Sequence, residues 1–319
     1  MTISTSRALS AYRFSAGIDY ITLKGLQKQP LPELDGKAIW PASAPDKLTV
    51  HDATPADVVL LAKTFPCALI DELEVRVDIR TAKPLPADLQ SRALNAFTTE
   101  FVAKRLMPVF IDGTNGGFRG AYDPSLKKTI PYNRRVPAPE AQLLMGHRND
   151  GVQVKSYYKR FDQGKSLSVA QHCIRVEVRI GMVGLDHHGL STIEDLLGFK
   201  FRKALMPYFT HVSGSRRRKV RKSRRSRLLE LLHAKQGEFD LPHWERVGVG
   251  AFLPGGDRQK PDLVFKRDTE LNNRIGQALG RLERTFSDEK FVRLLIFPNP
   301  RRTASMRLPA ALVKSAMTY

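Results

Sequence analysis

Cysteine is scarce in this sequence, and long apolar runs are absent from it. Cys67 and Cys173 are the two cysteines among 319 residues, too few for a disulfide framework or a zinc ribbon. Their apolar neighbours predict that both are small buried hydrophobes. No stretch approaches the roughly 18 consecutive apolar residues that a membrane span needs, so we expect no membrane partner. The first residues lack the apolar segment of a secretory signal, and we expect a cytoplasmic protein.

The sequence also contains fewer acidic than basic residues. The chain has 32 Asp and Glu against 52 Lys and Arg, a formal net charge of +20, and this excess predicts a polyanionic partner, by default nucleic acid. Nine of the twelve residues in 216–227 are basic, and the chain remains at +11 without them. Such a run is often a solvated linker, but a chain that is basic elsewhere as well is more typical of binding along a phosphate backbone. The residues of the run that we expect to bind DNA are Arg216, Arg217, Arg218, Lys219, Arg221, Lys222, Arg224 and Arg225.

The pattern of apolar residues predicts an α+β fold with two parts. A central, largely antiparallel sheet with helices on one face is expected in residues 1–212, and a basic, mostly helical DNA-binding region in 213–319. The composition shift at Ser213-Gly214-Ser215 marks the boundary. Residues 111–140, rich in Gly, Pro and Asn, indicate a long loop with one hairpin. Helical spacing or start signals occur at 54–63, 87–105, 192–209, 228–235 and 268–286.

Three segments alternate strictly between apolar and polar residues, and 17–24 indicates a further strand. Because side chains alternate across a strand, each of the three would bury one face and present polar groups on the other. These polar groups are Glu74, Arg76 and Asp78 in 72–80, Gln153, Lys155, Tyr157 and Lys159 in 152–159, and Arg175, Glu177 and Arg179 in 174–180.

Two interpretations of this polar face are open. It is either the solvated side of an ordinary antiparallel sheet or a site that processes phosphodiesters. In the second case, the carboxylates would hold a hard cation such as Mg²⁺ or Mn²⁺, and a tyrosine would form a covalent phosphotyrosyl intermediate. A free tyrosine hydroxyl has a pKa of about 10, which Lys155, Lys159 or the metal would have to lower.

Three motifs on these strands resemble one known family. They are LEVRVDI at 73–79, MGHRNDGVQVKSYYK at 145–159 and CIRVEVRI at 173–180, and together they span about a third of the chain. They are similar to three strands of the replication initiation factor family, which read Leu-Asp-Leu-Ala-x-Asp, Phe-Gly-x-Arg-Asp-Ser leading to Arg-Ile-Tyr-x-Lys, and Arg-Val-Glu-Ile-Glu-Leu. The family includes rolling-circle initiators of small plasmids, replication proteins of some filamentous phages and related relaxases of conjugative elements.

The resemblance implies a metal-dependent, site-specific endonuclease and strand transferase that starts rolling-circle replication. Tyr157 matches the nicking tyrosine, eleven residues after Gly146 as in the family, and Lys159 matches the lysine two residues later. Glu74, Asp78 and Glu177 are the expected metal ligands, and Lys155 and Lys159 would neutralise the phosphate. DNA at the replication origin, duplex and single-stranded, is the expected partner, with a host helicase as a further candidate.

Some positions depart from the family pattern or have an ordinary alternative. Glu74 stands where Asp is commoner, and Arg179 replaces a second glutamate. Tyr158 adjoins Tyr157, but alternation places it on the apolar face. Arg148 either holds a phosphate or is a surface residue. The adjacent pair His187 and His188 would diverge on a strand and is not expected to bind metal.

Two other functions remain open. One is a non-catalytic DNA-binding protein that shares the sheet, such as a repressor or a theta-type initiator. The other is a conjugative relaxase with the same chemistry. The loop GTNGGFRG lacks the lysine and spacing of a P-loop, so ATP hydrolysis has no support.

Overall fold

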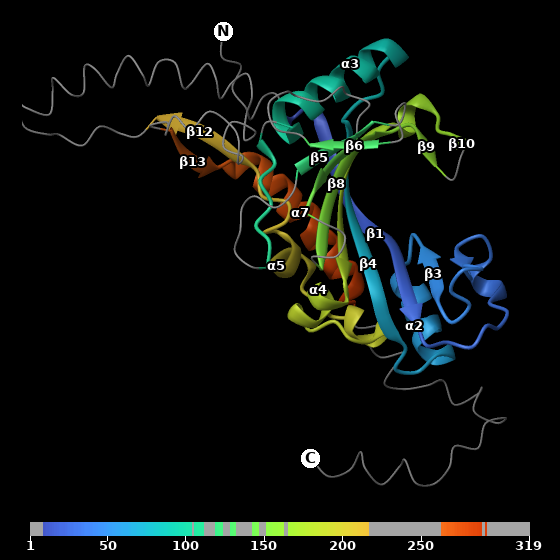
Figure 1. Cartoon of the computed structure of the whole chain (residues 1–319). Coiled ribbons are helices and arrows are strands. Elements are labelled where there is room, and N and C mark those ends of the chain that lie inside the picture. The colour runs from blue at the N-terminus through green and yellow to red at the C-terminus, as the bar shows by residue number, and fades with distance from the viewer. Residues whose placement is uncertain are drawn as a thin grey trace, which may run out of the picture.

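The computed structural model describes residues 9–103, 105–111, 119–123, 128–131, 142–146, 151–162, 165–216, 263–288 and 291. Within these residues, one sheet of nine strands, in the order β2-β3-β1-β4-β11-β8-β7-β5-β6, dominates the fold (Figure 1). All its neighbouring pairs are antiparallel, and helices complete the α+β fold that the sequence predicts. The outer strands are β2 (Ala38–Ile39), β3 (Leu48–His51), β5 (Arg119–Asp123), β6 (Lys128–Pro131) and β7 (Gln142–Met145).

Four long strands form the middle of the sheet. They are β1 (Tyr12–Lys24), β4 (Leu69–Thr81), β8 (Val152–Lys159) and β11 (Cys173–Gly181). Their β-branched residues suit a pleated surface, and their strict alternation fixes the register, because a slip of one residue would turn every apolar side chain outward. Val75 pairs with Val178, which in turn pairs with Val154, so apolar residues of three strands meet on one face.

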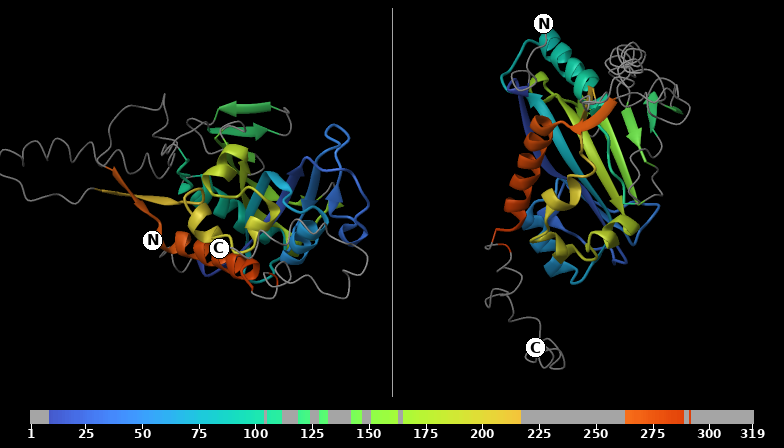
Figure 2. Two further views of the ribbon diagram at one scale, coloured as in Figure 1. Left: turned by 90° about the horizontal axis from the view of Figure 1, so that it is seen from below. Right: turned by 90° about the vertical axis from the view of Figure 1, so that its left-hand side faces the viewer.

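Helices cover this apolar face. The longest, α7 (Thr269–Phe286), begins at Asp268, whose side chain accepts a hydrogen bond from the Leu271 N–H and caps the helix. The short helices α4 (Met182–His187) and α5 (Phe201–Leu205) lie on the same side (Figure 2). The α7 residues that join the hydrophobic core recur at helical spacing, at Leu271, Ile275, Leu279 and Leu282.

The sequence locates two other helices correctly. Helix α2 (Pro55–Thr64) starts with a capping box in which Thr54 and Asp57 bind each other's backbone N–H. Helix α3 (Ala87–Phe97) continues as one π-helical segment, Thr98–Ala103. The expected hairpin in 111–140 is the pair β5–β6, and a two-stranded hairpin, β9 (Phe161–Asp162) with β10 (Lys165–Ser166), follows β8.

Two sequence-based expectations are wrong. Residues 192–209 do not form one helix: a 3₁₀ turn at Ile193–Leu196 and helix α5 are separated by Gly198, whose φ of 88° is left-handed and whose N–H binds the Phe286 carbonyl. Cys67 is exposed, at a positive φ of 58° in the connection from α2 to β4, whereas Cys173 is buried as expected. In both places a tight turn overrides the hydrophobic pattern.

The division at residue 213 stays a prediction. Strand β12 (Val212–Arg216) pairs with β13 (Leu263–Arg267), and α7 then packs on β1, so part of 213–319 lies against the sheet. The expected helix at 228–235 lies outside the described residues. Within the described part of the chain, no helix has the length and apolar character that crossing a bilayer requires.

Candidate active site on the polar face

The register of the four central strands brings the polar side chains of the three motifs together. Glu177 on β11 lies opposite Arg76 on β4 and Lys155 on β8. One step along the strands, Arg175 lies opposite both Asp78 and Tyr157. The three strands whose alternation the sequence predicts are therefore neighbours in one sheet, and their polar residues share a face.

A fourth strand adds a residue that the sequence analysis missed. Ile18 of β1 pairs with Val75, and Tyr20 pairs with Glu74, so two residues of β1 span one of β4 and Asp19 lies in a β-bulge. Bulges redirect a side chain and break the alternation from which strand faces are predicted. The buried residues before and after the bulge have opposite phases, Phe14 and Ile18 against Ile21 and Leu23, so alternation over the whole strand does not assign Asp19 to one face.

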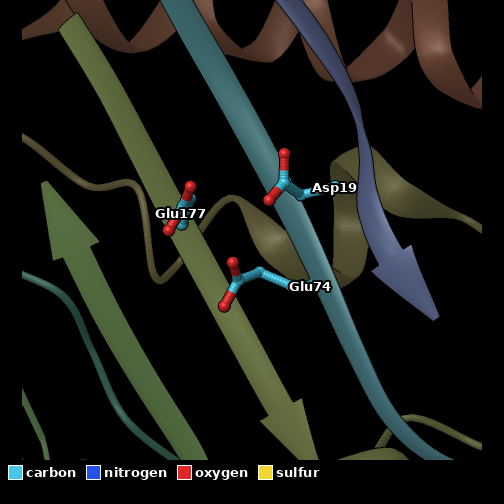
Figure 3. A group of neighbouring side chains, drawn as sticks. All are labelled: Asp19, Glu74 and Glu177. Atoms are coloured by element: carbon cyan, nitrogen blue, oxygen red, sulfur yellow. The ribbon is translucent and has the colours of Figure 1, made fainter. Parts of the chain in front are cut away.

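Asp19, Glu74 and Glu177 form a carboxylate triad. One carboxylate oxygen from each lies within 4.8 Å of the other two, and Figure 3 shows the three side chains converging from β1, β4 and β11. Glu74 and Glu177 are each about 1% exposed. Burial, together with the negative charge of Glu177, raises the pKa of Glu74 to about 8, although Lys155 opposes the shift. The surroundings thus favour the protonated form of Glu74 at neutral pH.

Lys155 bridges two members of the triad. Its Nζ lies 2.7 Å from Glu74 Oε2 and 3.0 Å from Glu177 Oε2. Burial disfavours the charged form of this lysine, but the carboxylates of Glu177 and Glu74 outweigh that effect and raise its pKa. Lys155 therefore stays positively charged and neutralises part of the negative charge of the two carboxylates.

Tyr157 donates a hydrogen bond to the triad. Its Oη lies 2.6 Å from Glu177 Oε1, and the side chain is half-buried. Burial and the adjacent Glu177 raise its pKa, so the phenol is protonated and acts as a donor here. Tyr158 faces the other way, with its Oη 3.1 Å from His172 Nδ1. The prediction that the two tyrosines lie on opposite faces is confirmed.

Asp78 lies on the same face but outside the triad. Its two oxygens accept hydrogen bonds from Arg175 Nε at 2.7 Å and Nη2 at 3.0 Å, and Arg80 Nη2 lies 3.1 Å away. Burial alone would raise its pKa, but the hydrogen bonds and charge of Arg175 lower it. Arg175 Nη1 also reaches Asp19 Oδ1 at 2.6 Å. Asp78 thereby positions the arginine that holds Asp19.

The other expected site residues lie apart from the triad or outside the described residues. Lys159 ends β8, with its Nζ 2.9 Å from Asp162. His188 contacts Tyr208 Oη at 2.8 Å through Nε2, beside His187 at the end of α4. The side chain of Arg216 is not described, and the following residues lie outside the described part of the chain: Arg148, Arg217, Arg218, Lys219, Arg221, Lys222, Arg224 and Arg225.

The triad has the chemistry of a site for a hard divalent cation. Carboxylate oxygens are the ligands that Mg²⁺ and Mn²⁺ prefer, and a bound cation would stabilise the ionised form of Glu74, whose pKa is raised to about 8. Asp19 Oδ1 is shared with Arg76 Nη1 at 2.7 Å and Arg175 Nη1 at 2.6 Å, which fixes this carboxylate beside the other two. The donor set and its rigid support fit such an ion.

Comparisons with known proteins give a match among solved structures. No protein-family model matches the chain, and no curated protein matches it. The solved structure is that of a rolling circle replication initiator protein from Geobacillus stearothermophilus, with 12% identity over 69% of this chain and 96% of that one, at a TM-score of 0.29. That protein is an initiator of the kind that the three motifs resemble. A TM-score of 0.29 does not establish a shared fold, so the function proposed below rests on the geometry of the site.

Proposed function

We propose that this protein nicks DNA at a specific site and starts rolling-circle replication, with Tyr157 as nucleophile and Mg²⁺ or Mn²⁺ as cofactor. The observation that carries the proposal is the 2.6 Å hydrogen bond from Tyr157 Oη to Glu177, a member of the carboxylate triad. A nucleophile, a proton acceptor and candidate metal ligands thus lie together on one face. The net charge of +20 supports a polyanionic substrate.

The chain's own groups can perform the transfer. Glu177 accepts the proton of Tyr157 as Oη attacks phosphorus, forming the tyrosyl–phosphate bond. The bond from phosphorus to the 3′ oxygen breaks, and that oxygen takes up a proton and leaves as a 3′-hydroxyl primer end. The protein stays linked to the 5′ phosphate. Attack by a 3′-hydroxyl on this link reverses the step and joins strands.

Each charged neighbour has a distinct role in this proposal. Asp19, Glu74 and Glu177 would hold the cation, which supplies charge that stabilises the phenolate and polarises the phosphate. Lys155 orients Glu177 through its 3.0 Å contact, and Lys159 lies on the same face beyond Tyr157 to neutralise phosphate. Asp78 acts indirectly, by holding Arg175 against Asp19. The basic residues of 216–225 and Arg148 remain candidates for DNA contacts.

The same contacts favour a second candidate function, that of a non-catalytic DNA-binding protein. Lys155 and Arg175 already pair with the carboxylates, and the raised pKa of Tyr157 suits a hydroxyl that only donates a hydrogen bond. An ion-pair network of this kind could simply stabilise the polar face of a sheet. A repressor or theta-type initiator would then bind the origin without cutting it. A conjugative relaxase shares the proposed chemistry and would differ only in its substrate DNA.

Plasmid relaxation separates the catalytic from the non-catalytic candidate. The full-length protein is incubated with a supercoiled plasmid that carries its own origin, with Mg²⁺, with Mn²⁺ or with EDTA. We expect nicked circles and a covalent protein–5′-DNA adduct with a divalent cation, and neither product in EDTA. Binding to the origin without either product in both metals would reject the nickase and support the second candidate.

A further inference from the structure

A second row of charged residues crosses the polar face next to Tyr157. Ser15 pairs with Asp78, and Arg175 pairs with both Asp78 and Tyr157, so these four residues form one row across β1, β4, β11 and β8. Two residues further along the strands, Arg13 pairs with Arg80, while Lys159 stands two residues beyond Tyr157 on β8. We call Arg13, Arg80 and Lys159 the cationic row. The cationic row therefore lies about 7 Å along the strands from the row that contains Tyr157. This distance is comparable to the spacing of successive phosphates along an extended nucleic-acid strand.

The two arginines of the cationic row are in an arrangement that an anion would stabilise. Like charges directly opposite each other on neighbouring strands are destabilising. Arg80 is partly compensated by Asp78 at 3.1 Å and by a hydrogen bond to Ser15 Oγ at 3.3 Å. Arg13 is exposed, and among the described residues no carboxylate pairs with it. Its guanidinium is therefore available for a phosphate, whose geometry it matches.

A pocket of about 390 Å³ opens beside the two arginines. It lies where β1 begins and β4 ends, against the start of α3 and the 3₁₀ turn Val169–Gln171. Its walls are held in place by the buried Gln90, whose side chain accepts a 2.6 Å hydrogen bond from Thr81 Oγ1. Its lining combines cationic groups with small or apolar ones, including Phe14, Ala82, Pro84 and Ala170.

We propose that this pocket holds one unpaired nucleotide of the DNA strand whose phosphodiester lies at Tyr157, with Arg13 and Arg80 on its phosphate. The inference rests on the proposed function, and it assigns to this pocket the contacts of one nucleotide that flanks the cleavage point. The guanidiniums supply the phosphate contacts, and the apolar lining receives the base. A base pair of a duplex would keep the base stacked and out of the pocket.

The test measures binding of the full-length protein to a fluorescent oligothymidylate of about 15 nucleotides and to a duplex of equal length, by anisotropy in EDTA. Arg13→Gln removes a phosphate contact, and Ala170→Trp fills the pocket from its exposed rim. Arg284→Gln, on the exposed side of α7, and Ala42→Trp, in the connection from β2 to β3, are matched controls. The salt dependence of the dissociation constant is measured between about 50 and 200 mM.

The expected results differ for the two kinds of DNA. For Arg13→Gln on the single strand, the slope of log affinity against log salt concentration should become shallower by about 0.7. Over this salt range, the loss of affinity should therefore be smaller than the parent's by a factor of about 2.6. Ala170→Trp should weaken single-strand binding by about tenfold, as expected when one stacked base no longer binds, and leave duplex binding unchanged. Both control variants should behave as the parent.

Other outcomes would overturn the inference. A slope for Arg13→Gln equal to that of Arg284→Gln removes the arginine from the phosphate path. Single-strand binding by Ala170→Trp equal to that of Ala42→Trp, or an equal weakening on duplex, removes the pocket as a site for an unpaired nucleotide. If both variants behave as expected but the plasmid is never nicked, the nucleotide site stands and the proposed function fails.

Discussion

Replacing Asp78 or Asp19 by asparagine separates the two roles that acidic residues have on the polar face. Asp78 is 4% exposed and binds Arg175 through both oxygens. Removing one partner of a buried ion pair costs about 3–5 kcal/mol. Since Arg175 keeps its contact with Asp19 and asparagine keeps one acceptor, we expect Asp78→Asn to lower the free energy of unfolding by about 3 kcal/mol.

Asp19→Asn should have the opposite profile. Asp19 is partly exposed and binds Arg76 and Arg175 through one oxygen, so its replacement should cost about 1 kcal/mol of stability. Asp19 is, however, one of the three proposed metal ligands. Replacing a residue that only supports a ligand already weakens metal binding about tenfold or more, so Asp19→Asn should weaken Mn²⁺ binding by at least about tenfold. Asp78→Asn leaves all three residues of the triad in place, so it should weaken Mn²⁺ binding less than Asp19→Asn does.

Urea unfolding in EDTA and Mn²⁺ titration by calorimetry measure the two quantities. The pH dependence of the free energy of unfolding is a further test. The pKa of Asp78 is lowered in the folded state, so as the pH falls the unfolded state binds the proton first. The stability from this pair is present at neutral pH and is lost as pH falls below about 4, where Asp78→Asn and the parent should converge. A variant at Asp78 with parental stability and weakened Mn²⁺ binding would refute the assignment and make Asp78 a ligand.

Three further predictions test other parts of the molecule. Tyr157→Phe should abolish the covalent DNA adduct while leaving duplex binding intact, whereas Tyr158→Phe should still form the adduct; the reverse result, seen on a denaturing gel, would exchange their roles. His211 is fully buried, and burial lowers its pKa to about 4, so the unfolded state takes up the proton first and stability is lost as pH falls from about 6.5 to 4. In urea unfolding, this acid-induced decrease should be smaller by about 3 kcal/mol in His211→Gln, and an equal decrease would contradict the assignment. Replacing the six arginines in 216–225 by glutamine should make the salt slope for duplex binding shallower by about 0.9 for each phosphate that the variant no longer binds, and an unchanged slope would show that the run only keeps the protein soluble.

The sequence predicts the framework of the site because alternation is a strong signal in its central strands. Residues 72–80, 152–159 and 174–180 become β4, β8 and β11, and they are neighbours in the sheet, with Tyr157 and Glu177 on one face. Helices α2 and α7 are predicted for a similar reason, since a capping box and a helical period are both local patterns.

The parts that the sequence does not predict depend on contacts between distant segments. Asp19 reaches the triad through a bulge that exists only in the pairing of β1 with β4. Asp78 belongs to the same polar face as Glu74, but whether its carboxylate meets a cation or an arginine depends on the rotamer of Arg175 across the sheet. The break at Gly198 is likewise stabilised by the carbonyl of Phe286, far along the chain.

The carboxylate triad is hard to explain as a purely stabilising feature. The sheet already buries an apolar face under α7, and replacing buried ion pairs by apolar residues is often neutral or stabilising. Glu74 is held in surroundings that raise its pKa to about 8, so its ionisation costs folding free energy at neutral pH. Because Arg175 and Asp78 are two further buried charges that orient Asp19, the arrangement favours a bound cation over a passive network. Tyr157 donates its hydrogen bond to Glu177 of this same triad, so the proposed nucleophile lies where such a cation would act.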